Sequence, residues 1–193
     1  MFALCLHPRH LTDIKNLLKG TSLELFDVEF NSTNGGSFIF FVAQKSNKFL
    51  SCAKEKIDKI IEEEKKSCSF SSLKMFAQKC NEQKEIVRSW FSNELSKGKK
   101  IAGLGASTKG NIALSFFELS FEEISIIGDV NKDKFGSYTP VGSIPIIDQK
   151  ELLKMNFDYF VVLPWHFKEY FLSQKLFEGK KLVFLHPELE IIE

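Results

Sequence analysis

The chain has 193 residues, of which 44% are apolar and 26% charged, a composition typical of a globular protein large enough to bury a substantial core. Its 26 Lys and Arg nearly balance its 25 Asp and Glu, which excludes the strong basic field that attracts nucleic acids or acidic membranes. No apolar run reaches membrane-spanning length, and the first residues lack the apolar stretch of a signal peptide. We therefore predict a cytoplasmic protein with no nucleic-acid or membrane partner.

The cysteines and two early histidines bear on metal binding. Four widely spaced cysteines form no C-x-x-C pair, which argues against a zinc knuckle and favours reduced thiols: Cys5, Cys52, Cys68 and Cys80. His7 and His10 stand three residues apart and can face one cleft. A metal site needs a third ligand, and none is evident nearby, so we predict no bound metal.

The first quarter of the chain predicts one helix and two strands. Residues 11–19 have apolar side chains at helical spacing, and Gly20 can end that helix. Residues 22–30 alternate apolar and acidic, residues 31–36 form a turn, and residues 37–43 are almost wholly apolar, so an antiparallel strand pair is expected. Two strands and one helix cannot cover their own apolar faces, so we expect this part to pack on something else.

Two long helices are predicted next. Residues 48–65 place apolar side chains along one stripe, and residues 67–72 form a serine-rich break. The second helix covers residues 72–95, and its charged residues are interpreted as a solvated face. We expect its apolar side to consist of Leu73, Phe76, Ala77, Cys80, Val87, Trp90 and Phe91.

From residue 99 onward, strands and helices alternate. Strands are expected at 100–104, 123–129, 158–163 and 181–185, and helices at 110–119, 148–154 and 167–177. This alternation predicts an α/β fold with a parallel sheet covered by helices on both faces. Such sheets bind ligands beyond the carboxyl ends of their strands, where three unusual segments fall.

The first of these segments is a glycine-rich turn between a strand and a helix. Such a turn leaves backbone N–H groups and the positive end of the helix dipole facing one spot, which suits a phosphate. The third glycine of the dinucleotide signature is replaced by Thr108, so the turn indicates an anion site rather than an NAD site, with a plain strand–helix connection as the alternative. The candidates are Gly103, Gly105, Ala106, Ser107, Thr108, Lys109, Gly110 and Asn111.

The other two segments follow the second and third strands. Asp129 can accept hydrogen bonds from a ribose or close an Asp–Asn turn, and Tyr138 can stack on a base or pack the loop. Trp165 can serve as a platform for a ring, and His166 as a hydrogen-bond donor or base, with packing and helix capping as the alternative. The candidate ligand-binding residues here are Asp129, Asn131, Lys134, Tyr138, Trp165 and His166.

Together these segments carry a resemblance to a known family. They read G-x-G-A-S-x-K-G-N at 103–111, D-x-N-x-x-K-x-G-x-Y-T-P at 129–140 and L-P-W-x-F-K at 163–168. This combination resembles the C-terminal domain of S-adenosylmethionine-dependent sugar C-methyltransferases, which methylate a carbon of nucleotide-linked deoxysugars. The resemblance covers about residues 98–193. It extends more loosely to 27–38, where N-G-G-S-F resembles the last strand pair of the family's methyltransferase domain.

The resemblance implies how the chain is organised. It implies that residues 1–47 are the end of a methyltransferase domain, 48–97 a helical connector, and 98–193 a Rossmann-like domain. In that domain 103–111 and 129–138 would face the nucleotide and its diphosphate. In the family a base removes a proton next to a keto group, and the enolate attacks the methyl sulfonium, a step served by an H-E-H segment. His7 and His10, within H-P-R-H, are the catalytic candidates that this implies.

The chain also departs from the family. It carries neither a glycine-rich S-adenosylmethionine motif nor a zinc-ligand cysteine cluster. We therefore expect the chain to bind a dTDP-type nucleotide sugar. By itself it should bind no cofactor, although the full-length family uses S-adenosylmethionine. It should also be incomplete for methyl transfer. It would be a fragment, a split-gene product with a companion methyltransferase chain, or a remnant.

Two other functions remain open on the sequence. The chain can instead be a non-catalytic Rossmann-like interaction or oligomerisation module, for example a homodimer. An NAD(P)-dependent oxidoreductase is disfavoured by Thr108 and by the lack of a separate substrate domain.

Overall fold

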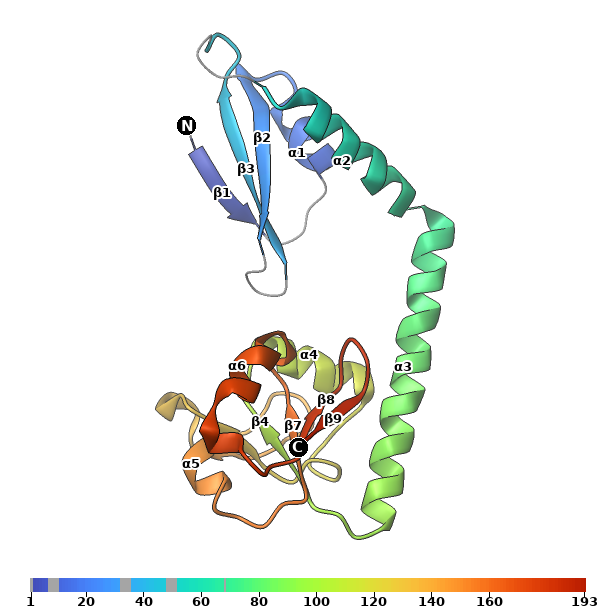
Figure 1. Cartoon of the computed structure of the whole chain (residues 1–193), viewed down its shortest axis with the longest axis vertical. Helices are drawn as coiled ribbons and strands as arrows, with labels where there is room; N and C mark the ends of the chain where they lie inside the picture. Colours follow the sequence, from blue (N-terminus) through green and yellow to red (C-terminus); the bar gives the residue numbers. More distant parts are fainter. Residues whose placement is uncertain (1, 7–10, 32–35, 48–51, 68) are drawn as a thin grey trace. The chain divides into compact units, whose positions relative to one another are not determined.

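The computed structural model describes residues 2–6, 11–31, 36–47, 52–67 and 69–193 (Figure 1). Its contacts divide the chain into two compact units, Met1–Ala77 and Gln78–Glu193, and the division falls inside one long helix, α3 (Phe70–Ser96). Within the described part of the chain, no helix is both long and apolar enough to cross a membrane.

The front unit contains a three-stranded antiparallel sheet. Its strands are β1 (Phe2–Leu6), β2 (Leu23–Asn31) and β3 (Ser37–Gln44), in the order β1-β3-β2, with a bulge in β2 between Leu25 and Asp27. The predicted antiparallel pair of β2 and β3 is confirmed. β1 was not predicted. A short run of five apolar residues shows no alternation, so its pattern does not distinguish a strand from other apolar segments.

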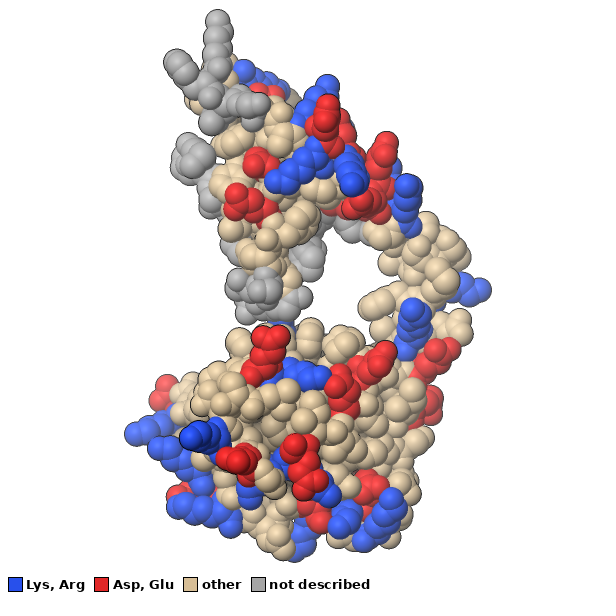
Figure 2. All heavy atoms as spheres, in the orientation of Figure 1, with Lys and Arg blue, Asp and Glu red and all other residues tan. Residues whose placement is uncertain are grey.

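Two helices, α1 (Leu11–Leu18) and α2 (Lys54–Ser67), pack against this sheet. Glu64 of α2 caps the start of α1, since its carboxylate accepts from the Leu11 amide at 2.6 Å. α2 begins later than the predicted residue 48: Cys52 and Ala53 are not helical, because the Ala53 amide donates instead to the Phe26 carbonyl of β2 at 2.7 Å. Lysines and acidic side chains lie over α2 (Figure 2), as is usual for the solvated face of a helix.

The long helix α3 begins at Phe70, so the serine-rich break is shorter than predicted. Only the second half of its predicted apolar side is buried. Val87 and Phe91 are fully buried in the second unit, whereas Leu73 is 55% and Phe76 65% exposed. Helical spacing alone does not predict which half is buried. It shows which side chains share one face of the helix, but not whether another part of the protein packs on that face.

The second unit is built on a six-stranded sheet of order β6-β5-β4-β7-β8-β9. All neighbouring strands are parallel except β9, which is antiparallel to β8. The predicted parallel sheet is confirmed. β6 and β9, each three residues long, were missed because such short runs carry no readable period. The strands are β4 (Ile101–Leu104), β5 (Ile127–Asp129), β6 (Ile146–Asp148), β7 (Tyr159–Val162), β8 (Leu182–Phe184) and β9 (Glu190–Ile192).

Helices cover both faces of this sheet, as predicted. One apolar core joins the sheet to α3 and α4 (Thr108–Phe117), and a second joins it to α5 (Gln149–Leu152) and α6 (Lys168–Ser173). The predicted helix 167–177 is divided, because Gln174 is extended and separates α6 from a short 3-10 turn, η4 (Lys175–Phe177). Two further 3-10 turns are η2 (Lys132–Lys134) and η3 (Trp165–Phe167).

Candidate functional site

The carboxyl ends of β4, β5 and β7 lie side by side at one edge of the parallel sheet. β4 is the centre of this edge, since the chain places β5 and β6 on one side of it and β7 and β8 on the other. Numbered along the chain from β4, the strand order is 3-2-1-4-5-6, and ligands of such sheets bind where the order reverses. The glycine turn overlaps the end of β4, Asp129 is the last residue of β5, and Pro164–His166 come just after β7.

The glycines of the turn are required by packing. Gly105 has a φ of +79°, and a Cβ there would lie 2.7 Å from Cδ of Pro164. A Cβ on Gly110 would lie 2.8 Å from Cβ of Leu163, so the turn after β4 contacts the segment after β7 closely. These glycines therefore bring two ligand-binding candidates, the turn and the Trp165 segment, to the same place.

Most backbone donors of the turn are used within the protein. The Ser107 amide donates to the Gly105 carbonyl at 2.8 Å, and the Ser107 side chain caps α4 by accepting from the Gly110 amide at 2.9 Å. The Ala106 amide donates to Asp129. The Thr108 amide, at the first residue of α4, has no partner among the described residues. The start of α4 can thus offer a backbone donor to an anion, but not a full ring of them.

Asp129 and Lys134 hold this turn in place. Asp129 is only 5% exposed, and its carboxylate accepts from the Ala106 amide at 2.7 Å and from the Asn131 amide at 2.8 Å. The Lys134 ammonium lies 3.1 Å from the same carboxylate and donates to the Ala106 carbonyl at 2.9 Å. With three internal donors, Asp129 has little capacity left for a ribose hydroxyl.

Four side chains gather beyond β4, β7 and β8. The Lys109 ammonium lies 5.7 Å from the centre of the Trp165 ring, and the His186 ring packs edge-on against Trp165 at 4.7 Å. His166 follows Trp165, and its ring lies 4.2 Å from the Phe167 ring at a tilt of 39°. We call Lys109, Trp165, His166 and His186 the rim cluster.

Burial and charge keep the rim histidines neutral. Desolvation, followed by the Lys109 charge, lowers the pKa of His166 below its ordinary value of 6.5. Desolvation also lowers the pKa of His186. An anion placed here would favour the protonated imidazoles and so reverse both shifts.

His186 was not among the predicted site residues, although the sequence held a usable signal. It directly follows the strand predicted at 181–185, as Pro164–His166 follow the strand before it. Parallel neighbouring strands end at the same edge of a sheet, so this position alone could have found it.

Two buried polar atoms near the start of α4 and η3 have no hydrogen-bond partner within the described ranges: Asn111 Oδ1 and His166 Nδ1. Buried polar atoms are rarely left unpaired, and such an atom needs an explanation such as a water or a ligand. Both residues were predicted as ligand-binding, and their free atoms are suited to a ligand that can both donate and accept.

Other predicted residues lie apart from the rim cluster. Tyr138 is exposed and pairs with Pro145, which precedes β6, so it lies toward the amino end of that strand. Asn131 is exposed and caps η2, with its side chain accepting from the Asp133 amide at 3.1 Å. His7 and His10 lie outside the described residues, and within the described ranges no three His, Cys, Asp or Glu side chains are grouped as a metal site.

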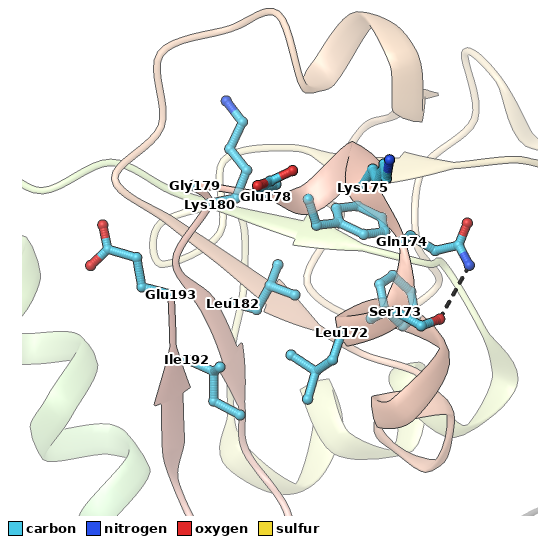
Figure 3. A pocket seen from close by; sticks show the side chains of 12 residues that line it. Leu172, Ser173, Gln174, Lys175, Glu178, Gly179, Lys180, Leu182, Ile192 and Glu193 are labelled. Atoms are coloured by element: carbon cyan, nitrogen blue, oxygen red, sulfur yellow. Dashed lines mark hydrogen bonds between the residues drawn. The ribbon is translucent and has the colours of Figure 1, made fainter.

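A cavity of about 290 Å³ lies elsewhere in the second unit, between α6, η4, β8 and β9 (Figure 3). Phe171, Phe177 and Leu182 form its apolar floor, and Lys175 and Glu178 lie at its border. It opens beside Leu182, at the amino end of β8, and therefore on a different side of the sheet from the rim cluster.

A sheet of this order, covered on both faces and with a glycine turn after its first strand, defines the Rossmann-like class of α/β domain. Residues 32–187 match the family described as the C-methyltransferase C-terminal domain, and the chain belongs to this family. It is 24% identical over 187 residues to the C-methyltransferase NovU of Streptomyces niveus. That alignment covers 94% of this chain but 44% of NovU, so the chain spans less than half the length of this relative.

Proposed function

We propose that this chain is the C-terminal part of a sugar C-methyltransferase and that its rim cluster binds the nucleotide diphosphate of a deoxysugar. The single observation that carries the proposal is the placement of Lys109 over Trp165 at the start of α4, beside His166 and His186. A lysine and the positive end of a helix suit a diphosphate, and aromatic rings suit a base. The family match supports a role in C-methylation.

The rim does not fit S-adenosylmethionine. That cofactor carries a sulfonium and an ammonium, whereas the rim cluster presents the Lys109 ammonium, which would repel both cations. Asp129, the acidic residue that ends β5, accepts hydrogen bonds from Ala106, Asn131 and Lys134. We therefore propose that methyl transfer needs the cofactor-binding part of the enzyme, and that this chain contributes the substrate-holding domain.

Calorimetry tests the proposal directly. Thymidine diphosphate should release heat on titration into the chain, and S-adenosylmethionine should not. Lys109→Gln should weaken nucleotide binding about tenfold or more, since it removes one charge-assisted contact to phosphate. Lys132→Gln, at an exposed lysine of η2, is the matched control and should bind as the parent chain does. No heat with any nucleoside diphosphate would refute the proposal.

A non-catalytic interaction module is the second candidate function. The specific observation in its favour is the exposed apolar stretch of α3, which includes Phe70, Leu73 and Phe76. Light scattering separates the two functions: a stable oligomer that binds no nucleotide favours the interaction module, and a monomer that binds nucleotide excludes it.

A further inference from the structure

Another cavity lies wholly within the front unit, whereas the rim cluster belongs to the second unit. Its volume is about 420 Å³, and it is lined by α1, the start of β2, the residue after β3 and the start of α2. Cavities of this size are typical of sites for small organic molecules. None of the predicted site residues that the structure describes lines it.

The floor of this cavity is apolar. Leu25 and Ile57 are buried, and Leu18 and Leu23 are partly buried against the same core. The partly exposed leucines offer apolar surface inside a hollow, which the apolar body of a ligand can cover and so remove from water.

Positive charge gathers around this floor. Four lysines and two carboxylates, those of Glu24 and Asp58, line the cavity. The chain as a whole has a net charge of only +1, so the excess of lysines at this hollow is a local feature. A concave site lined by charge of one sign attracts ligands of the opposite sign. The lysines are Lys15, Lys19, Lys45 and Lys54.

Two of these lysines are available to a ligand. Lys45 donates to a backbone carbonyl at 2.9 Å, and the Lys15 ammonium lies 3.4 Å from the Asp58 carboxylate. Within the part of the chain that the structure describes, the ammonium groups of Lys19 and Lys54 have no hydrogen-bond or ion-pair partner. Lys54 is also the first residue of α2, where the positive end of the helix dipole favours an anion.

Cys52 contributes a neutral thiol to the cavity wall. Desolvation, followed by the charges of Glu24 and Asp58, raises its pKa above the ordinary value. The thiol lies 3.7 Å from the Leu25 carbonyl, to which it donates. Because the thiolate and not the thiol is the nucleophile, the cavity suits reversible binding rather than a covalent bond to Cys52.

We propose that this cavity binds a phosphate monoester with an apolar body, such as an alkyl or aryl phosphate. The ammonium groups of Lys19 and Lys54 pair with the phosphate, which carries about two negative charges near neutral pH. Leu18 and Leu23 contact the apolar body. The inference is independent of the proposed nucleotide binding, which involves residues of the second unit alone.

Calorimetry with octyl phosphate tests both parts of the ligand. Octyl phosphate should bind to the chain. Inorganic phosphate, which lacks the apolar body, and octanol, which lacks the charge, should each bind at least about tenfold more weakly. Octanoate carries a single negative charge and should also bind more weakly than octyl phosphate.

A pair of double variants tests the lysines. Lys19→Gln/Lys54→Gln should weaken octyl phosphate binding about tenfold or more, because it removes two charge-assisted contacts. Lys59→Gln/Lys65→Gln removes two exposed lysines of α2 that do not line the cavity, and it should bind as the parent chain does. Thermal melts show that both double variants are folded.

Cys52 also reports where the ligand binds, since it is exposed and lines the cavity. Octyl phosphate should slow the reaction of Cys52 with iodoacetamide and leave Cys80, in the second unit, unchanged, as mass spectrometry of the modified peptides would measure.

Four outcomes would overturn the inference. They are no binding of octyl phosphate, equal binding of octanol or octanoate, full binding by Lys19→Gln/Lys54→Gln, and a rate of Cys52 modification that octyl phosphate does not change. Binding to phosphatidic acid vesicles without binding of octyl phosphate would indicate a membrane surface instead, and it would overturn the inference as well.

Discussion

Gly105 combines two requirements at a single position. Its φ of +79° disfavours any side chain, and a Cβ would clash with the Pro164 ring at 2.7 Å. Gly136 has a φ of +75°, but a Cβ there would meet nothing within 4 Å. We predict that Gly105→Ala lowers the free energy of unfolding by about 2–4 kcal/mol and Gly136→Ala by about 1 kcal/mol. Urea unfolding measures both, and equal losses would show that contact with Pro164 is unimportant.

Lys134 connects the η2 turn to the glycine turn through Asp129 and the Ala106 carbonyl. Lys134→Met should lower the free energy of unfolding by about 1–2 kcal/mol, because the buried Asp129 carboxylate then keeps only its two amide donors. The same change should weaken thymidine diphosphate binding, since Ala106 directly precedes the cap of α4. Lys132→Met, in the same turn but exposed, is the control, and an equal loss there would contradict this role for Lys134.

The rim histidines predict how stability depends on pH. Their folded pKa values lie below 6.5, so between those values and 6.5 the unfolded chain binds more protons than the folded chain. Stability should therefore fall as the pH is lowered from about 7.5 to about 5.5, the range that spans an ordinary histidine pKa. Thermal melts of the parent chain and of the double variant His166→Gln/His186→Gln measure this. A double variant that loses as much stability as the parent would contradict the prediction.

At the scale of elements, the two halves of α3 differ in what they bury. Phe91 is 1% exposed in the core of the second unit, whereas Phe76 is 65% exposed. Phe91→Ala should cost about 3–5 kcal/mol of stability, the usual cost of removing a buried aromatic ring. Phe76→Ala should change it by less than about 0.5 kcal/mol. Both tryptophans, Trp90 and Trp165, lie in the second unit, so their fluorescence follows its unfolding.

The elements also show what could be predicted from the sequence. The strands with long apolar runs, β3, β4 and β7, were predicted, because local pattern and burial agree there. The three-residue strands β6 and β9 could not be, because their pairing depends on neighbours far along the chain. Within the site, the sequence predicted that the segments after β4, β5 and β7 would lie together, because they follow strands that end at the same edge of the sheet. The engagement of Asp129 by Ala106 and Lys134 depends on three-dimensional packing that no spacing reveals.

At the scale of the whole molecule, the rim cluster lies entirely in the second of the two compact units. We propose that the second unit binds the nucleotide diphosphate of a deoxysugar at the carboxyl edge of its sheet. The family match of residues 32–187 spans both units.

The central claim is that the rim cluster binds a nucleoside diphosphate, and the two tryptophan indoles test it in one titration. Trp165 belongs to the rim cluster, whereas Trp90 packs against Tyr159 at the amino end of β7, with ring centres 5.2 Å apart. In nitrogen-15 NMR spectra of the chain, added thymidine diphosphate should shift the Trp165 indole signal and leave that of Trp90 in place. Spectra in which neither signal moves, or in which only Trp90 responds, would contradict the claim.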